Sequence, residues 1–136
     1  MFTILIVEDN RSFREALKDA LQSRFSFLAL ATAAGAEDAL AKIDSMRPDL
    51  IFMDMRLPDG NGLQLTRRLR AARNRAVVIV LTSHDLTEYR EDAVRSGADR
   101  FLVKSSANIS EILRHVESIL ASRFRALIVA EDAGFK

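Results

Sequence analysis

Short apolar runs of strand length alternate along the chain with longer segments that are apolar on one side only. Nearly every position of a run is apolar, as in strands that helices cover on both faces of a parallel sheet. Five runs carry the pattern, at residues 3–7, 27–31, 50–53, 76–81 and 100–103. The alternation predicts an α/β fold built on a doubly wound parallel sheet.

The segments between these runs have helical periodicity. In the first segment, apolar residues recur three and four positions apart, at Phe13, Ala16, Leu17, Ala20 and Leu21. A second helix is expected over 36–46, where Pro48 stops it, a third over 62–73 and a fourth near 86–96.

The last two predicted helices are also marked by residues at their ends. Asp85 and Glu88 have the spacing of a capping box at the start of the fourth helix, and Gly97 is its expected terminator. Asn108 and Glu111 have the same spacing at the start of a fifth helix. Five strands and five helices are therefore expected.

Length and composition favour one ordinary globular domain. A chain of 136 residues can bury one good core, and 49% hydrophobic with 29% charged residues argues against wholesale disorder. The net charge of +1 argues against a broad basic face, so we expect no direct nucleic-acid binding, although a balanced total can hide local patches. The absence of cysteine excludes disulfides, thiolate nucleophiles and thiolate zinc sites.

The amino-terminal residues predict no targeting signal. No basic leader precedes the first apolar run, and Glu8 and Asp9 follow it at once. We therefore expect neither a signal peptide nor a membrane span, and a cytoplasmic protein.

Polar residues end four of the apolar runs. Glu8 and Asp9 follow the first run, Asp54 the third, Thr82 the fourth and Lys104 the fifth. Because the carboxyl ends of parallel strands meet at one edge of a doubly wound sheet, these side chains are expected to converge there.

Three carboxylates that lie close together repel one another and need positive charge. An all-oxygen set of ligands with retained water suits Mg²⁺ better than zinc. With Mg²⁺ on one side and the Lys104 ammonium on the other, a phosphoryl group fits on Asp54, where the Thr82 hydroxyl also reaches it. This arrangement makes Asp54 a candidate nucleophile that becomes an aspartyl phosphate.

The sequence resembles the receiver domain of two-component response regulators from about Thr3 to about Leu120. The resemblance rests on Glu8-Asp9, on Asp54 with Pro58 and Gly62 after it, on Thr82, and on GADRFLVKS, which contains Phe101 and Lys104. The resemblance implies the flavodoxin-like doubly wound fold, with the strand order 2-1-3-4-5 that receivers share with flavodoxin.

The resemblance also implies a phosphorylation switch. A sensor histidine kinase or a phosphotransfer protein donates the phosphoryl group to Asp54. Glu8, Asp9, Asp54 and the backbone carbonyl of Arg56 hold Mg²⁺, and Lys104 contacts the phosphoryl group. Thr82 then moves toward the phosphate and Phe101 rotates inward, which switches the face formed by the fourth helix, fifth strand and fifth helix. The domain is thus a signalling switch that catalyses only its own phosphorylation and dephosphorylation.

Four positions near the expected site depart from the family pattern or tune it. Ser105 follows Lys104 where many relatives have proline, and Ser83 stands where a small residue gates the phosphate. Arg56 and His84, each two residues after a site residue, occupy the positions at which relatives tune dephosphorylation.

Each candidate residue also has a simpler interpretation. Asp9 can cap the first helix, as can Asn10 or Ser12, and Asp54 can satisfy turn amides before Pro58. Lys104 alone would be a solvated lysine, and Phe101 an ordinary core aromatic. Four strand ends would have to carry the required groups by chance, which favours the site.

Other functional classes were weighed against the receiver. A receiver that binds partners without phosphorylation is the alternative, although the intact acidic pair, Asp54, Thr82 and Lys104 argue against it. Phosphohydrolases with an aspartyl nucleophile require a second aspartate two residues after the first, where this chain has Arg56. A P-loop nucleotide enzyme is excluded because its motif is absent. A flavin-binding relative of this fold needs a hydroxyl-rich phosphate loop, whereas EDNRSF offers acid.

The carboxyl-terminal part extends beyond the segment that resembles a receiver. We expect a receiver domain over 1–122 and a helical extension or tail over 123–136, either as a stand-alone receiver or as a piece of a longer regulator of the type that carries a helix-turn-helix domain. Apolar spacing predicts one helix from Ile109 to about Ala130 that leaves Phe124, Leu127 and Ile128 bare. We expect these to contact a second copy, as a homodimer, or another partner segment; a short extra strand, ALIVA, is the alternative.

Overall fold

A computed structural model describes residues 1–104 and 108–134, with side chains as far as residue 125. The chain divides into two compact units, residues 1–106 and 107–136. The first unit contains strands β1 (Thr3–Val7), β2 (Ala29–Ala33), β3 (Leu50–Asp54), β6 (Val77–Thr82) and β7 (Arg100–Val103). Its helices are α1 (Arg11–Arg24), α2 (Ala36–Met46), α3 (Gly62–Ala71) and α4 (Thr87–Ser96).

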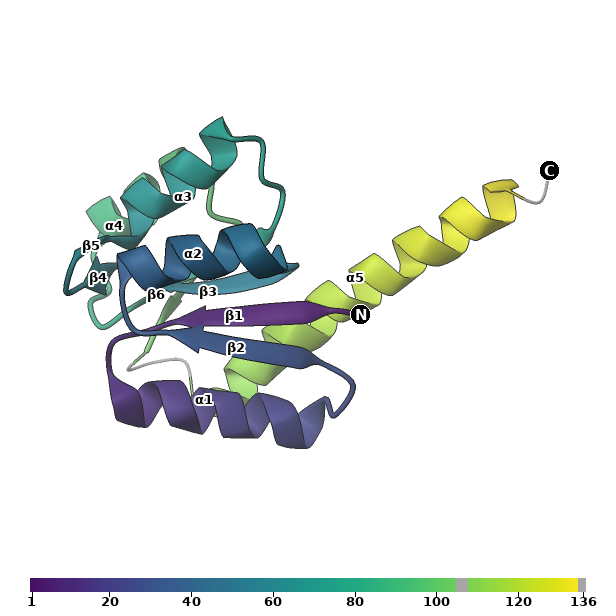
Figure 1. The fold of residues 1–136 in the computed structure, drawn as a ribbon, viewed down its shortest axis with the longest axis horizontal. Coiled ribbons are helices and arrows are strands. Elements are labelled where there is room, and N and C mark those ends of the chain that lie inside the picture. Colours follow the sequence, from purple (N-terminus) through teal and green to yellow (C-terminus); the bar gives the residue numbers. More distant parts are fainter. Residues whose placement is uncertain (105–107, 135–136) are drawn as a thin grey trace. The chain divides into compact units, whose positions relative to one another are not determined.

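The five strands form one parallel sheet in the order β2-β1-β3-β6-β7. Helix α1 lies on one face and α2 and α3 on the other, with α4 beside α3 (Figure 1). Two very short strands, β4 (Arg56–Leu57) and β5 (Gly60–Asn61), pair separately as a hairpin. Without the hairpin, the order is 2-1-3-4-5, so the predicted fold class is confirmed.

Burial explains why the strands are apolar throughout. Ile4, Leu5, Ile6 and Val7 of β1 are all completely buried. Leu5 and Val7 belong to one buried cluster with residues of α2 and α3, while the alternation of side chains along a strand turns Ile4 and Ile6 to the opposite face. A strand covered on both faces cannot alternate with polar residues.

The second strand begins later than the sequence predicts. It spans Ala29–Ala33, not 27–31, because the chain first makes a turn in which the Leu28 N–H donates to the Phe25 carbonyl at 3.1 Å. Phe25 is buried, and Phe27 packs edge-on against it while remaining 62% exposed. The apolar run at this point therefore includes a turn as well as a strand.

The predicted caps have mixed outcomes. Gly97 terminates α4 in the left-handed conformation, as expected. The predicted capping box is wrong, because Leu86 is the N-cap residue of α4 and Asp85 pairs with Arg90 at 3.1 Å. Asn10 caps α1 by accepting the Phe13 N–H at 3.0 Å, which leaves Asp9 free of that role.

The second unit contains helix α5 (Ile109–Gly134). Asn108 accepts the Glu111 N–H at 2.9 Å, as predicted for this helix start. The backbone stays helical through the ALIVA segment, so the extra strand is wrong. Phe124 is 62% exposed, whereas Leu127 and Ile128 lie beyond the described side chains, and their contact with a second copy or partner stays a prediction. Among the described residues, no helix combines the length and apolar character needed to cross a bilayer.

Candidate functional site

The predicted strand-end residues meet around one hollow of about 320 Å³ at the carboxyl edge of the sheet. Its lining includes most of the predicted site, namely Asp9, Asp54, Arg56, Thr82, Ser83, His84 and Lys104, together with Asn10. Glu8 is completely buried beside them, and Phe101 does not line the hollow. The predicted convergence of Glu8, Asp9, Asp54, Thr82 and Lys104 is therefore present in the structure.

Asp54 is held by the hairpin that follows β3. Its Oδ1 accepts the backbone N–H of Arg56 at 3.2 Å, and the side chain is almost entirely buried. The hairpin returns the chain so closely that a Cβ on Gly62 would lie 2.0 Å from the Asp54 carbonyl oxygen. Only glycine fits at this approach, which explains the loop sequence after the apolar run.

Asp54 is one of three carboxylates that lie close together in the site. Oxygens of Glu8, Asp9 and Asp54 all lie within 4.8 Å of one another. The backbone carbonyl of Glu8 is fixed by the Arg14 guanidinium, which donates to it at 2.9 Å. On the Glu8 side chain, Oε2 accepts the Asn10 N–H at 3.1 Å, and the buried Oε1 forms an ion pair with the Lys104 ammonium. The three carboxylates thus form a cluster of oxygen ligands suited to a hard cation.

The acidic cluster changes the ionisation of Asp54. Burial raises the pKa of Asp54 to about 7, and Glu8 adds to the shift through hydrogen bonding to the neutral form and through its negative charge. Lys104 and the Arg56 N–H oppose the shift, because both favour the carboxylate. In the absence of a cation, Asp54 is therefore partly protonated near neutral pH.

Lys104 supplies the positive charge at the site. Its Nζ lies 3.4 Å from Asp54 Oδ2 and also forms an ion pair with Glu8 Oε1. The ammonium lies 5.2 Å from the centroid of the Phe13 ring, which adds a cation–π contact from α1. The lysine side chain is only 14% exposed, so it is held in place and is not a freely solvated lysine.

The β6 end contributes hydroxyl groups and a backbone turn. Thr82 is buried, and its Oγ1 accepts the backbone N–H of His84 at 3.2 Å. Its hydroxyl retains its own proton for a further acceptor. Ser83 and His84 are exposed at the mouth of the hollow. Helix α4 begins shortly after them, so changes at Thr82 can reach that helix directly.

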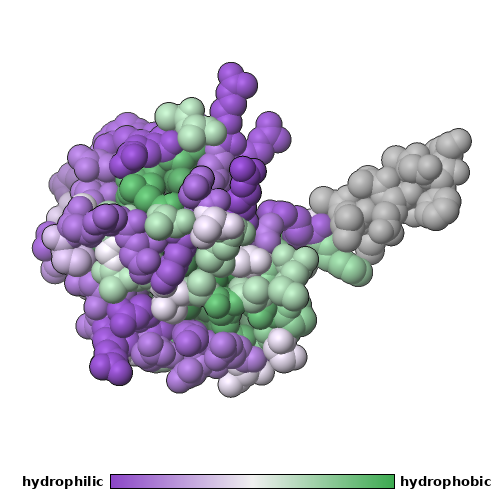
Figure 2. Space-filling model, viewed as in Figure 1, coloured by the Kyte–Doolittle hydropathy of each residue, from purple (hydrophilic) through white to green (hydrophobic). Residues whose placement is uncertain are grey.

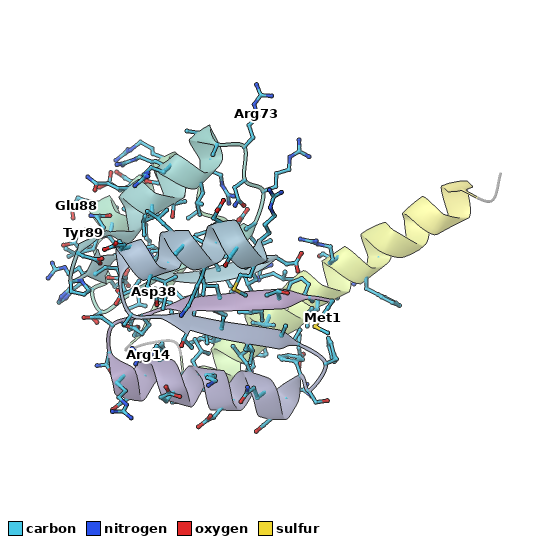
Figure 3. All side chains as sticks on the ribbon, in the orientation of Figure 1. Met1, Arg14, Asp38, Arg73, Glu88 and Tyr89 are labelled. Carbon is cyan, nitrogen blue, oxygen red and sulfur yellow. The ribbon has the colours of Figure 1, made fainter. Side chains whose placement is uncertain are left out.

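Two contacts join the mouth of the hollow to α4. The Arg56 guanidinium donates to the hydroxyl of Tyr89 at 3.3 Å, and Tyr89 lies on the α4 side of the molecule (Figure 3). The Arg90 guanidinium lies 4.8 Å from the centroid of the half-buried Phe101 ring. Phe101 is therefore linked to α4 although it is away from the hollow.

The sequence-based reasoning missed Asp59. The aspartate lies in the turn of the hairpin, and its carboxylate accepts the backbone N–H groups of Ala36 at 2.5 Å and Glu37 at 3.0 Å. These bonds hold the pKa of Asp59 below its usual range and cap α2, whose own N-cap residue, Gly35, has no side chain to do so. No local pattern could reveal a cap from 23 residues away. Phe13 was likewise predicted only as part of an apolar helix face.

Comparison with known proteins agrees with this geometry. Residues 4–117 match the family model described as the response regulator receiver domain. The chain is 32% identical over 123 residues to the DNA-binding transcriptional activator DevR/DosR of Mycobacterium tuberculosis, covering 90% of this chain and 56% of that protein. It is 33% identical over 117 residues to response regulator MprA of Mycolicibacterium vanbaalenii, covering 86% and 49%. The chain thus spans about half the length of these curated relatives.

A solved structure shares the fold at high coverage. The CheY-like response regulator receiver domain protein from Methanospirillum hungatei JF-1 superimposes with a TM-score of 0.82 at 26% identity. The match covers 93% of this chain and 98% of that one.

Proposed function

Because the chain belongs to the response regulator receiver domain family, we propose that it is a phosphorylation switch in which Asp54 accepts a phosphoryl group. The observation that carries the proposal is the placement of Asp54 between an acidic pair, Glu8 and Asp9, and the ammonium of Lys104. We place the receiver domain at about residues 1–122.

The acidic cluster fits Mg²⁺. The three carboxylates are oxygen ligands within reach of one another, and the Lys104 ammonium that pairs with the buried Glu8 Oε1 is shared with Asp54. Glu8, Asp9, Asp54 and the carbonyl of Arg56 would hold the ion, with water completing its coordination. When bound, Mg²⁺ supplies positive charge that polarises the phosphoryl oxygens and offsets their repulsion from the carboxylates.

The chemistry at Asp54 is a transfer of phosphoryl between a nitrogen and an oxygen. A carboxylate oxygen of Asp54 forms a bond to phosphorus while the P–N bond of a phosphohistidine breaks. The electron pair of that bond passes to the ring nitrogen, and the histidine leaves neutral because its other ring nitrogen carries a proton. The Lys104 ammonium leaves its contact with Glu8 and pairs with the phosphoryl oxygens. A sensor histidine kinase or a phosphotransfer protein is the donor we propose.

The response to phosphorylation starts at Thr82. Its hydroxyl donates to a phosphoryl oxygen, and the Ser83 side chain is small enough to leave that path open. Movement of Thr82 pulls on the turn held by the His84 N–H and so on the start of α4. Phe101, which Arg90 contacts from α4, then changes its packing. The face switched in this way carries the output to another part of the protein or to an effector.

Arg56 and His84 set the lifetime of the phosphorylated state. Both line the mouth of the hollow, where they control the approach of water to the aspartyl phosphate. A phosphorylation-independent interaction domain is a weaker proposal for this chain, because nothing in that role requires a buried Asp54 next to two acids and a lysine.

The assignment of Asp54 can be tested by intact-mass measurement. Incubation with phosphoramidate and Mg²⁺ is expected to add one phosphoryl group to the parent chain and none to Asp54→Asn. Asp59→Asn is the matched control, because Asp59 lies five residues away and caps α2. Undiminished labelling of Asp54→Asn would refute the assignment.

The role of Thr82 predicts a separate effect on the response. Thr82→Ala should still be labelled. The chemical-shift changes that beryllofluoride induces over residues 86–101 should, however, be at most about half of those in the parent. The reason is that the variant loses the Thr82 hydroxyl, whose contacts differ between the unphosphorylated and phosphorylated states. Thr66→Ala, a buried threonine of α3 that donates to the Gly62 carbonyl, is the control for a lost hydroxyl. Equal shifts in Thr82→Ala and in the parent would contradict the role.

A further inference from the structure

A second concave surface lies between α2 and α3, away from the acidic cluster. A hollow of about 690 Å³ is lined by the carboxyl-terminal parts of both helices, and one of about 330 Å³ continues it toward the hairpin. Leu40 and Arg68 line both, so the two form one groove, called here the α2–α3 groove. Figure 2 shows hydrophobic surface between α2 and α3 bordered by hydrophilic residues. Leu40, Ile43 and Leu69 supply apolar lining.

Four exposed arginines line the wider end of the groove: Arg47, Arg68, Arg73 and Arg75. Among the described residues, no acidic side chain pairs with them, and Asp44 is the one acid in the lining of the wider end. Arg70 of the same helix is different, because it bonds to Asp99 and to the Gly97, Asn74 and Ala76 carbonyls. Arg70 thus helps to hold the fold together, whereas the four arginines that line the groove make no such contacts among the described residues.

The positive charge of the groove comes largely from one short, arginine-rich segment of the sequence. Five arginines occur between residues 67 and 75, and no acidic residue occurs between Asp59 and Asp85. The net charge of +1 therefore hides a local basic surface.

The backbone provides an independent observation. Arg47 and Arg73 have φ values of 46° and 61°, and in the described part of the chain they are the only residues other than glycine with positive φ. The left-handed conformation disfavours any residue with a Cβ, and helix ends of this kind usually carry glycine or asparagine. Both exceptions are arginines, and both line the wider end of the groove. Arg73 projects beyond the end of α3 (Figure 3). Strained positions that collect at one surface indicate a function there.

We propose that the α2–α3 groove binds an acidic amphipathic segment of a partner protein. Apolar side chains of the segment would pack on the half-buried Leu40, with the nearly buried Ile43 and Leu69 beneath it. Its carboxylates would pair with the arginines, whose planar groups suit carboxylate oxygens. The apolar lining favours a peptide over nucleic acid. At the narrow end, Glu37 and Asp59 line the groove and repel a phosphate backbone, and they orient the segment with its acidic end toward the arginines. The proposal goes beyond phosphorylation and uses none of its residues.

The direct test is an NMR titration of the full chain with a designed helical peptide of 14 residues. The peptide has leucines at helical spacing along one face and four glutamates near one end. We expect amide shifts to change mainly over residues 36–47 and 65–75, with a dissociation constant on the order of 0.1 mM at low salt that rises as salt is added. A peptide with lysine in place of each glutamate should not bind.

Two sets of variants separate binding from a structural role of the arginines. Arg47→Gly with Arg73→Gly relieves the backbone at both helix ends, so the melting temperature should be equal to or above that of the parent while peptide affinity falls roughly threefold to tenfold. Arg75→Gln lowers affinity without touching a left-handed position. Arg67→Gln is the matched control, since Arg67 is exposed on α3 but does not line the groove, and its affinity should not change.

Several results would overturn the proposal. These are the absence of peptide binding, equal binding of the lysine peptide, or unchanged affinity in the Arg47 and Arg73 double variant. A lower melting temperature with unchanged affinity would assign both arginines to the helix ends, where basic side chains interact with the helix dipole. Tighter binding of a single-stranded oligonucleotide than of the acidic peptide would assign the groove to nucleic acid instead.

Discussion

Chelation of Mg²⁺ is expected to slow phosphorylation of Asp54 at least about a hundredfold. The incoming phosphoryl group is dianionic and must approach three carboxylates whose oxygens lie within 4.8 Å of one another. Lys104 is a single positive charge, and it is already shared between Glu8 and Asp54. Without a cation, the site repels the donor and also keeps part of the Asp54 population protonated, and a protonated carboxyl is a poor nucleophile.

Mg²⁺ binding and phosphorylation should be measured separately. Mg²⁺ titrations followed by NMR give the affinity, and the initial rate of labelling by phosphoramidate gives the chemistry. Glu8→Gln should weaken Mg²⁺ binding at least roughly tenfold, because an amide replaces a carboxylate beside the ion. Glu37→Gln is the matched control, since Glu37 is an exposed acid on α2 outside the cluster. Labelling at the same rate in the presence of a chelator would rule out the metal requirement.

The elements that could be predicted from sequence are those whose residues are nearly all buried. Strands β1 and β3 are buried on both faces, so their apolar runs are continuous and their positions are nearly those predicted. Strand β2 was misplaced because Phe25 and Phe27 are also apolar, although they cover a turn. An apolar residue in the sequence indicates that its side chain packs against others in the fold. It does not indicate whether its backbone is in a strand or in a turn.

Local capping signals were correct at the start of α5 and wrong at the start of α4. Asn10 and Asn108 accept the backbone N–H three residues later, as such signals require. Asp85 instead pairs with Arg90, and α2 receives its cap from Asp59 in a distant hairpin. The Asp59 contact spans 23 residues and cannot be read from one sequence.

The candidate site was predictable because topology alone brings it together. Parallel strands align their carboxyl ends, so the residues at the carboxyl ends of β1, β3, β6 and β7 had to converge once the sheet was recognised. The contacts that hold these residues were not predictable. The Lys104 contact with the Phe13 ring and the Arg56 bond to Tyr89 depend on side-chain directions that the strand pattern does not fix.

Asp54→Asn is expected to stabilise the metal-free protein at pH 8 by on the order of 2 kcal/mol, or roughly 5–10 °C in melting temperature. The pKa of Asp54 is raised from 3.8 to about 7 on folding, chiefly by burial and then by Glu8. A full shift of this size corresponds to ~4 kcal/mol, and solvent in the open hollow screens part of it. Between these two pKa values the folded chain binds more protons than the unfolded chain. The parent should therefore be most stable below about pH 4 and lose stability as the pH rises toward 7, whereas asparagine stays neutral throughout.

Denaturant unfolding of the parent and Asp54→Asn from pH 4 to pH 8 measures this difference. The two should converge near pH 4 and separate as the pH rises. Asp59→Asn is a control of opposite sign, because the pKa of Asp59 is lowered by the Ala36 and Glu37 N–H groups, so that variant should lose stability relative to the parent mainly at higher pH. A parent whose stability is flat from pH 4 to pH 8 would contradict the burial of an ionising Asp54.

Excess Mg²⁺ should then reduce the advantage of Asp54→Asn at pH 8. A ligand present at a hundred times its dissociation constant stabilises the folded state by about 2.7 kcal/mol, and only the parent retains the full set of carboxylates. The stability that the parent gives up by ionising Asp54 next to Glu8 is thus recovered when a cation binds. In the proposed function, the charge arrangement expected to destabilise the metal-free fold is the same one that would select a cation and then a phosphoryl group.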